Sequence, residues 1–447
     1  MDATTPDLQD AKAAGSRTGV LAVVASCFGW GLDLFDLFIL LYVAPAVGQH
    51  FFPSHEPMLS LAGAYAAFAV TLLMRPLGSA VFGSYADRHG RKGAMIVAVA
   101  GVGIATAAFG LLPTVEMIGI WATVLFLLLR LVQGVFVGGV VASTHVIGTE
   151  SVPERWRGMM SGTIGGGGAA IGTLLASFAF MGVSYVFPGD SFNQTGWRFM
   201  FFCGLITSAI GLVLFRGLVE SPHFREAQKA KDAKRSVSKA VAGVSPVKTL
   251  LANPDYRKRF LVNLLLSTGA GASYYLTAGY LPTYLKLVDG LSGPAASTIM
   301  LLGSVAGAVS SVGLGELSQH IGRKKAFLLI GAACFLLLPY LILHLGDVSG
   351  GTIVAYALAI SFLGSASMAP LMIFLNERFP TDIRSTGTGL SWNVGFAIGG
   401  IMPTFVSLAS ATPAAIPQTL AIFLGATSAL YLIGGIVAPE TKGRLAS

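Results

Sequence analysis

Long apolar runs alternate with short polar and charged segments along the whole chain. A helix needs roughly 20 mostly apolar residues to cross the hydrocarbon core of a bilayer, and windows of that length can be placed twelve times. The pattern predicts membrane-spanning helices at 19–47, 59–82, 93–112, 119–147, 158–186, 197–217, 258–286, 294–316, 325–345, 351–376, 385–409 and 417–438. An even number of spans places both termini on the same side of the membrane.

A polar stretch between residues 217 and 258 separates the spans into two groups of six. It is rich in Lys, Arg, Glu and Asp, and such a stretch cannot cross a bilayer. We therefore expect an all-α integral membrane protein with a six-helix bundle at 1–217, a cytoplasmic linker at 218–257 and a second six-helix bundle at 258–447.

The two groups of spans look like repeats. Segment 150–157 has the pattern E-x2-P-x3-R, and segment 377–384 has it again. Segment 83–92 recurs more weakly as 315–324. Internal repeats of this kind are typical of several transporter folds.

Composition excludes a soluble globule. Of the 447 residues 54% are hydrophobic and only 11% are charged, whereas an average soluble protein has about 25% charged residues. The formal net charge of +8 does not indicate nucleic-acid binding, because 25 of the 29 Lys and Arg residues fall in segments on one side of the predicted membrane. Arg198 and Lys286 fall on the other side, and Arg75 and Arg130 lie inside spans. By the positive-inside rule the basic side, with both termini, is cytoplasmic.

No pattern for a metal, a cofactor or enzymatic chemistry stands out. Cys27, Cys203 and Cys334 all lie in apolar spans without a pairable or zinc-binding spacing, so packing roles are expected for them. No nucleophile with a matching base recurs in the spans, which argues against an enzyme. The polar N-terminal segment lacks a small-residue cleavage pattern, which argues against a removed signal peptide.

Asp33 and Asp36 lie three residues apart inside the first span. A charge at the bilayer centre costs ~2.5 to 3.5 kcal/mol on insertion scales, so it usually faces a cavity or a partner. Carboxylates with a pKa near neutrality can take up and release a proton as access alternates, and we expect at least one of the two to couple transport to protons. The alternative is a fixed ion pair with Arg75 or Arg130.

Arg130 and Gln133 share one face of the fourth span with two glycines. A guanidinium offers a planar fork for a carboxylate, so we expect both residues to contact substrate, with a pKa-setting or structural role for Arg130 as the alternative. For Arg75 a structural brace is favoured over substrate contact.

Polar and aromatic side chains in two later spans are further candidates for substrate binding. Aromatic walls with a few polar groups suit a small organic ligand. The candidates are Asn263, Tyr274 and Tyr275 in the seventh span and Trp392 and Asn393 in the eleventh. For Tyr284 a place in an interfacial aromatic belt is favoured.

Segment 83–92, with the spacing G-x3-D-R-x-G-R-K, resembles the signature loop of the major facilitator superfamily of transporters. Further motifs are similar to the metabolite:proton symporter family: R-P-L-G at 75–78, R-x2-Q-G-x3-G-G at 130–139 and E-S-P-x-F at 220–224. The segment 29–36 is closer to sialate and aromatic-acid symporters, and Val140 stands where the metabolite:proton family usually has Glu. The resemblance implies two pseudo-symmetric six-helix bundles that alternate access to a central site.

The resemblance also implies that charged residues at the cytoplasmic helix ends close an intracellular gate. The second copy of the signature loop has Gln319 where the first has Asp87, so a gating role of that carboxylate would be asymmetric between the halves. A loop that only anchors topology is the alternative. The residues assigned to the gate are Asp87, Arg88, Arg91, Glu150, Arg157, Glu377 and Arg384.

Together these features predict a monomeric, proton-coupled symporter in the inner membrane of a bacterium that imports a small organic anion by alternating access. The alternatives are import of a zwitterionic osmolyte of the betaine or proline type and, ranked lower, an efflux antiporter. No nucleic-acid partner and no cofactor is expected.

Overall fold

The computed structural model describes residues 6–89, 91–150, 153–216, 246–380 and 383–443. Its first half contains α1 (Pro6–Tyr42), α2 (Ala44–Phe51), α3 (Pro57–His89), α4 (Arg91–Leu111), α5 (Val115–Ile118), α6 (Ile120–Glu150), η1 (Glu154–Trp156), α7 (Arg157–Gly162), η2 (Thr163–Gly167), α8 (Gly168–Val186), η3 (Phe192–Gly196) and α9 (Trp197–Arg216).

The second half contains α11 (Pro246–Ala252), α12 (Pro254–Tyr274), η4 (Tyr275–Gly279), α13 (Leu281–Leu287), α14 (Gly293–Ile321), α15 (Arg323–Leu345), α16 (Gly351–Ala366), α17 (Leu371–Glu377), α18 (Arg384–Gly400), α19 (Met402–Ala409), η5 (Pro413–Ala415) and α20 (Ile416–Val437). Most of the expected linker, residues 217–245, lies outside the described residues.

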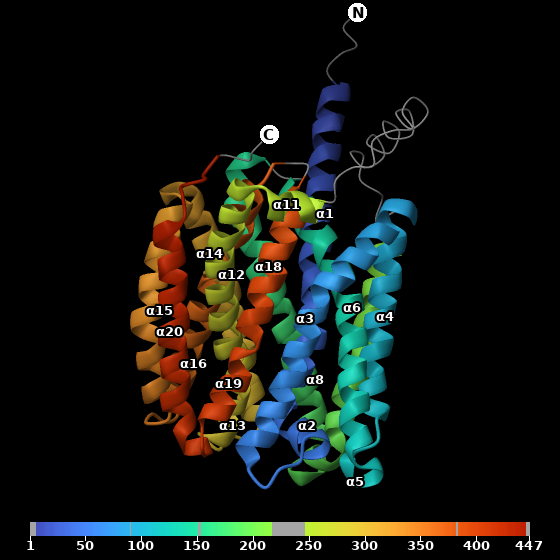
Figure 1. Cartoon of the computed structure of the whole chain (residues 1–447), viewed down its shortest axis with the longest axis vertical. Helices are drawn as coiled ribbons and strands as arrows, with labels where there is room; N and C mark the ends of the chain where they lie inside the picture. The colour runs from blue at the N-terminus through green and yellow to red at the C-terminus, as the bar shows by residue number, and fades with distance from the viewer. Residues whose placement is uncertain (1–5, 90, 151–152, 217–245, 381–382, 444–447) are drawn as a thin grey trace, which may run out of the picture.

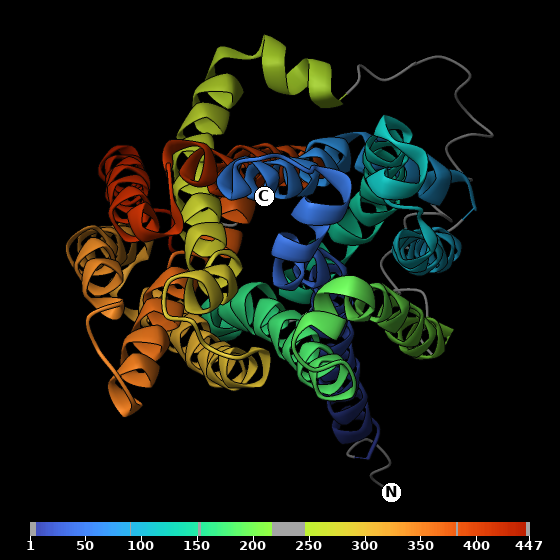
Figure 2. The same cartoon turned by 90° about the horizontal axis from the view of Figure 1, so that it is seen from below.

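The helices run roughly along the long axis of the molecule (Figure 1). Seen along that axis, the blue-to-green first half lies beside the yellow-to-red second half (Figure 2). The start of α1, the end of α20 and α11 lie at one end, which we call the terminal end, whereas α2, α5 and α13 lie at the opposite end (Figure 1).

Each expected span coincides with a helix or with a unit of consecutive helical segments. Among the described residues nine helices are long and apolar enough to cross a membrane, and the pair Ser26–Tyr42 and Ala44–Phe51, bent by 63°, adds a tenth. The apolar part of α4, Ile96–Leu111, is shorter than these candidate spans. The unit α12–η4–α13 carries the charged run 257–259 near its start. Hydropathy therefore predicted the order and the position of the spans.

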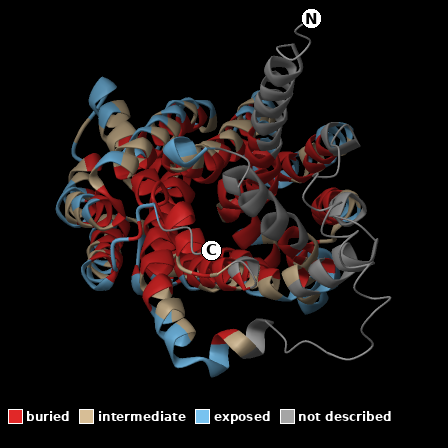
Figure 3. Ribbon diagram, turned by 90° about the horizontal axis from the view of Figure 1, so that it is seen from above, coloured by how far each residue is buried: buried red, intermediate tan, exposed pale blue. Residues whose placement is uncertain are grey.

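Burial follows the pattern of a protein in lipid. Buried residues gather between the helices, and exposed residues lie on the periphery (Figure 3). The exposed side chains include many large apolar ones, such as Leu73, Ile104 and Ile422. Because lipid tails are as apolar as leucine, such side chains are stable on a membrane-facing surface.

The two halves meet along two seams. In one, α3 packs against α18 and α19, and in the other α14 packs against α7, η2 and α8. Glycines let the helix backbones of the second seam approach each other closely. A Cβ on Gly158 would lie 2.6 Å from the carbonyl oxygen of Gly315, and a Cβ on Gly162 would overlap the carbonyl oxygen of Ser311. Small residues at such crossings let backbones approach, as is usual between membrane helices.

Candidate functional site

Asp33 on α1 forms an ion pair with Arg75 on α3. The Nη2 atom of Arg75 lies 3.2 Å from Oδ2 of Asp33, and both side chains are buried. The guanidinium also lies 5.9 Å from the ring centroid of Trp30, one turn before Asp33. Tyr275 of the second half is close enough to interact electrostatically with both charges. This ion pair therefore borders the interface between the halves.

Asp36 lies one turn further along α1 in a separate polar cluster. The hydroxyl of Thr106 on α4 hydrogen-bonds to the carboxyl group of Asp36. The amide of Gln133 donates to Thr106 Oγ1 at 2.7 Å and accepts from Arg130 Nη1 at 2.7 Å. A hydrogen-bonded chain thus links Asp36 to Arg130 through two intermediate residues.

Aromatic rings of the first half enclose Arg130. Its Cζ atom lies 4.2 Å from the ring centroid of Phe109, 5.3 Å from that of Phe126 and 6.0 Å from that of Phe201. Arg130 is fully buried, and among the described residues its side chain contacts only residues of the first half. These contacts favour a role beside Asp36 over direct contact with a substrate between the halves.

An aromatic cluster spans the interface next to the Asp33–Arg75 pair. Its members are Trp30 and Phe68 of the first half and Tyr274, Tyr275, Trp392 and Phe396 of the second half.

Ring contacts connect these six side chains across the two halves. Trp30 meets Trp392 edge-on at 5.8 Å between centroids, and Trp392 stacks on Phe396 at 4.0 Å. Tyr275 meets Phe396 at 6.1 Å and Phe68 at 5.1 Å. Contacts of this kind contribute about 0.5 to 1.5 kcal/mol each beyond burial, so the cluster helps to hold the halves together in this state.

Tyr274 extends the cluster towards α8. Its hydroxyl lies 3.5 Å from Thr173 Oγ1, and its ring meets Phe38 at 5.9 Å. Tyr274 and Thr173 also line a cavity of about 10 Å³ with Ser304 and Ser365 of the second half. That volume is close to the minimum for one water molecule.

Asn263, one of the two asparagines predicted to bind substrate, lies on the face of α12 that packs against α18. Asn263 Nδ2 donates to Ser391 Oγ at 3.3 Å, and both residues are fully buried. Asn393 is also buried, and its Oδ1 atom has no hydrogen-bond partner in the structure. The Oδ1 atom of Asn263 likewise has no hydrogen-bond partner among the described residues, so both asparagines present a buried acceptor that is available to a ligand.

At the terminal end Glu377 belongs to a buried network of the second half. Arg323 donates to Glu377 Oε1 and Oε2 at 3.2 and 3.3 Å, and Thr441 donates to Oε2 at 2.6 Å. Gln319 accepts from Arg323 at 2.7 Å, and its amide donates across the seam to the carbonyl oxygen of Glu154 at 3.2 Å. The network thus continues from Glu377 to the first half.

Most other residues assigned to the gate are not placed. Arg157 starts α7 at the terminal end and is half-buried. The side chains of Asp87, Arg88, Arg91, Glu150 and Arg384 lie outside the described residues.

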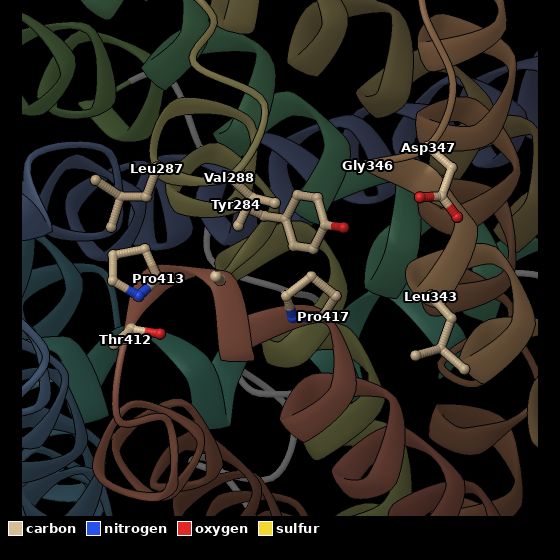
Figure 4. Close-up of a pocket in the computed structure, with 10 residues that line it drawn as sticks. Tyr284, Leu287, Val288, Leu343, Gly346, Asp347, Thr412, Pro413 and Pro417 are labelled. Atoms are coloured by element: carbon tan, nitrogen blue, oxygen red, sulfur yellow. The ribbon is translucent and has the colours of Figure 1, made fainter.

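A larger cavity, of about 550 Å³, opens at the opposite end within the second half (Figure 4). Tyr284, Leu343, Asp347 and Pro417 are among the residues that line it. Asp289 is close by, and burial raises the pKa of this carboxyl group to about 6. Because only residues of α13, α15, α20 and their connections line this cavity, it is separate from the aromatic cluster.

Four residues of the ion pair and the aromatic cluster were not predicted from the sequence to contact substrate. They are Arg75, for which a structural brace was favoured, and Trp30, Phe68 and Phe396. Arg75 carried a signal, since it is a charge inside an apolar span. Trp30 lies one turn before Asp33, on the same side of α1. For Phe68 and Phe396 the sequence offers no signal, because phenylalanine is common in membrane spans.

Comparison with known proteins decides the family. Residues 20–403 match the family model of the Major Facilitator Superfamily. The chain belongs to the major facilitator superfamily. The predicted fold class is thereby confirmed. Together with the relatives described next, the family identifies the chain as a multi-pass membrane transporter rather than an enzyme.

Two relatives of this major facilitator superfamily chain are bacterial transporters. The glycine betaine/proline/ectoine/pipecolic acid transporter OusA of Dickeya dadantii (strain 3937) is 32% identical over 386 residues, which cover 86% of this chain and 76% of OusA. The inner membrane metabolite transport protein YhjE of Escherichia coli (strain K12) is 30% identical over 435 residues, 96% of this chain and 95% of YhjE. The similarity to metabolite transporters that the motifs indicated is thus confirmed.

The fold also resembles a solved structure of the same superfamily. The proton:xylose symporter XylE bound to 6-bromo-6-deoxy-D-glucose superposes with a TM-score of 0.73 at 16% identity, over 96% of this chain and 98% of XylE. At that identity the likeness concerns the fold alone.

Proposed function

We propose that this chain imports a small zwitterionic solute of the betaine and proline type together with protons, across the inner membrane of a bacterium. The observation that carries the proposal is the aromatic cluster beside the Asp33–Arg75 pair. OusA, which is named as a transporter of glycine betaine, proline, ectoine and pipecolic acid, supports the same class of substrate. The organic-anion expectation from the sequence gives way to its zwitterionic alternative.

The chemistry of the cluster suits both ends of such a solute. Quaternary ammonium groups bind to the faces of aromatic rings, and Trp392, Phe396 and Tyr275 provide such faces once the halves separate. Arg75 provides a planar guanidinium for the carboxylate of the solute. A pure anion would use Arg75 but would gain nothing from the aromatic faces.

The two aspartates divide the remaining tasks. Asp33 neutralises Arg75 while the site is empty, and a substrate carboxylate that competes for Arg75 displaces it. Asp36, held inside the first half by Thr106, carries the proton beside Arg130. Substrate and proton then act on neighbouring turns of one helix.

The positive-inside rule assigns the terminal end to the cytoplasm, because the basic residues of α11, α12 and the segment after α20 lie there. The opposite end then faces the periplasm. The proposed cycle moves the central site from the periplasmic to the cytoplasmic side by rocking the two halves around it.

A matched pair of ligands tests the substrate class. Glycine betaine and 3,3-dimethylbutanoate have the same shape and the same carboxylate, but only betaine has a cationic nitrogen. We expect betaine to bind the purified protein more tightly and to accumulate in proteoliposomes when a pH gradient is imposed. Equal or tighter binding of 3,3-dimethylbutanoate would support the organic-anion reading instead.

A further inference from the structure

Lys286 on α13 reaches across the interface at the opposite end. Its Nζ atom donates to the carbonyl oxygen of Tyr42 at 3.1 Å and lies 4.0 Å from the ring centroid of Phe180. The ring of Phe192 lies 5.7 Å away. All three partners belong to the first half, whereas Lys286 belongs to the second.

The residues that contact Lys286 also contact one another through their aromatic rings. Phe180 meets Tyr42 edge-on at 5.4 Å and Phe192 at 5.1 Å. Tyr42 is the last residue of α1, and α2 starts after a bend of 63°. The carbonyl end of a helix attracts positive charge, so the ammonium group meets the end of α1 and an aromatic face together.

The charge of Lys286 has no carboxylate partner among the described residues. The ion pairs of the described part of the chain do not include it. Lys286 is one of two basic residues on the side of the membrane that the positive-inside rule leaves poor in Lys and Arg. A half-buried cation in that place requires a reason other than topology.

Arg198, the other basic residue at this end, behaves differently. Its Nη1 atom donates to the carbonyl oxygens of Gly110 and Leu112, and its guanidinium lies over the ring of Trp197. These contacts all stay within the first half. Arg198 therefore offers a matched control for Lys286, since its removal takes a charge from the same end without breaking a contact between the halves.

We propose that Lys286 is a positioning residue of the transport cycle, a latch that holds the end of α1 against α13 whenever the opposite end is closed. Water and the protein compete for the ammonium group: in the closed state it binds the Tyr42 carbonyl and the Phe180 ring, and in the open state it is hydrated. An ammonium held by neutral partners is released more readily than one in a buried ion pair. The latch is therefore strong enough to bias the closed state and weak enough to open.

The position of the latch connects it to the proton site. Tyr42 follows Asp36 by six residues on the same helix, about 9 Å at 1.5 Å per residue. A change at Asp36 that shifts or rotates α1 moves the carbonyl that Lys286 binds. The latch thus offers a mechanical route from the proton site to the opposite end.

A second set of contacts closes the same end without charge. Tyr65 of α3 stacks on Tyr280 at 5.1 Å and hydrogen-bonds to Thr283 at 2.8 Å. These contacts remain when Lys286 is changed, so the closed state is weakened but stays populated. The effect of losing Lys286 can therefore be measured as a shift in the population of the closed state.

Ser184 and Gly293 provide the reporter. Ser184 lies on α8 and Gly293 starts α14, and a Cβ on Gly293 would lie 3.4 Å from the Cβ of Ser184. That separation is near the range for disulfides. The pair Ser184→Cys and Gly293→Cys, with Cys27, Cys203 and Cys334 replaced by Ser, should form a disulfide across the halves in the closed state.

The experiment measures the initial rate of disulfide formation in proteoliposomes without substrate, so its result does not depend on which solute is carried. We expect Lys286→Ala to slow crosslinking by up to about fivefold, because about 1 kcal/mol changes the ratio of closed to open protein by that factor. Lys286→Arg should restore most of the rate, and Arg198→Ala should leave it unchanged.

A double-mutant cycle identifies the partner. Phe180→Leu should slow crosslinking when Lys286 is present and have no further effect in the Lys286→Ala background. Thermal unfolding of each variant verifies that it is folded. The proposal is overturned if Lys286→Ala crosslinks as fast as the parent, or if Arg198→Ala slows crosslinking as much as Lys286→Ala does.

Discussion

Asp33 and Asp36 lie one turn apart on α1 and yet have different partners. Asp33 pairs with Arg75 at the interface, where Tyr275 of the second half is close by. Asp36 is held by Thr106 inside the first half. A shift of one turn therefore separates a carboxyl group at the interface between the halves from one that lies inside the first half.

Neutral substitutions should separate the two roles. Asp36→Asn is expected to abolish uphill uptake on a pH gradient and to leave exchange of internal for external solute. Asp33→Asn is expected to impair both, because loss of one partner of a buried ion pair costs about 3 to 5 kcal/mol. Accumulation and exchange in proteoliposomes measure the difference, and uphill uptake by both variants would exclude proton carriage on α1.

The two buried arginines should also respond differently. Arg75→Lys keeps the charge but loses the planar fork, and we expect it to weaken solute binding roughly tenfold or more, as for a lost charge-assisted hydrogen bond. Arg130→Lys should lower the unfolding temperature and change the affinity little. Calorimetry on folded protein distinguishes them, and the opposite order of affinities would return the substrate role to Arg130.

The sequence predicted the spans and flagged both aspartates, because apolar length and intramembrane charge are properties of single segments. It left open which arginine each aspartate meets. That choice depends on how α1 is rotated against α3 and α6, and such packing is set by side chains far apart in the chain. For the same reason Phe68 and Phe396, which meet through Tyr275, carried no signal.

An aromatic substitution tests the cluster. Phe396→Leu keeps most of the apolar volume but removes a ring face, and we expect it to weaken binding of glycine betaine about 2- to 30-fold, the range that corresponds to a cation–π contact of 0.5 to 2 kcal/mol. Phe199→Leu is the control, because Phe199 is exposed on α9 and stacks on Phe187 away from the cluster. Equal affinities of the two variants would argue against a cationic group among these rings.

Glu440 should make part of the stability depend on pH. Burial would raise the pKa of this carboxyl group, but the backbone N–H groups of Lys442, Arg323, Lys324 and Thr441 donate to it and hold its pKa below the usual value. A lowered pKa in the folded state stabilises the fold above the pKa of the unfolded chain, and the contribution is lost as the pH falls through the folded value.

Glu440→Gln should therefore lower the unfolding temperature at neutral pH and flatten its decline below about pH 4.5, near the unperturbed pKa of Glu. Thermal unfolding in detergent between pH 3 and 7 measures both effects. If the variant and the parent lose stability in parallel as the pH falls, the N–H contacts at the start of α15 do not carry this part of the pH dependence.

Close packing at the terminal end predicts the effect of one methyl group. A Cβ on Gly162 would overlap the carbonyl oxygen of Ser311 on α14, whereas a Cβ on Gly182, further along the same helical unit, would have nothing within 4 Å. Overpacking of this kind typically costs about 1 to 3 kcal/mol. Because Gly162 and Ser311 belong to different halves, Gly162→Ala can relieve the overlap by separating the halves at that end.

The expected result is a shift towards the state that is open at the terminal end. Met372, which is buried on α17, would report it as Met372→Cys, since a maleimide that does not cross the bilayer should then label it several-fold faster from the terminal side in the Gly162→Ala background. Gly182→Ala should leave labelling and uptake as in the parent. Unchanged labelling in folded Gly162→Ala protein would mean that the seam absorbs the methyl group by local shifts, and that the contact between α7 and α14 does not govern opening at the terminal end.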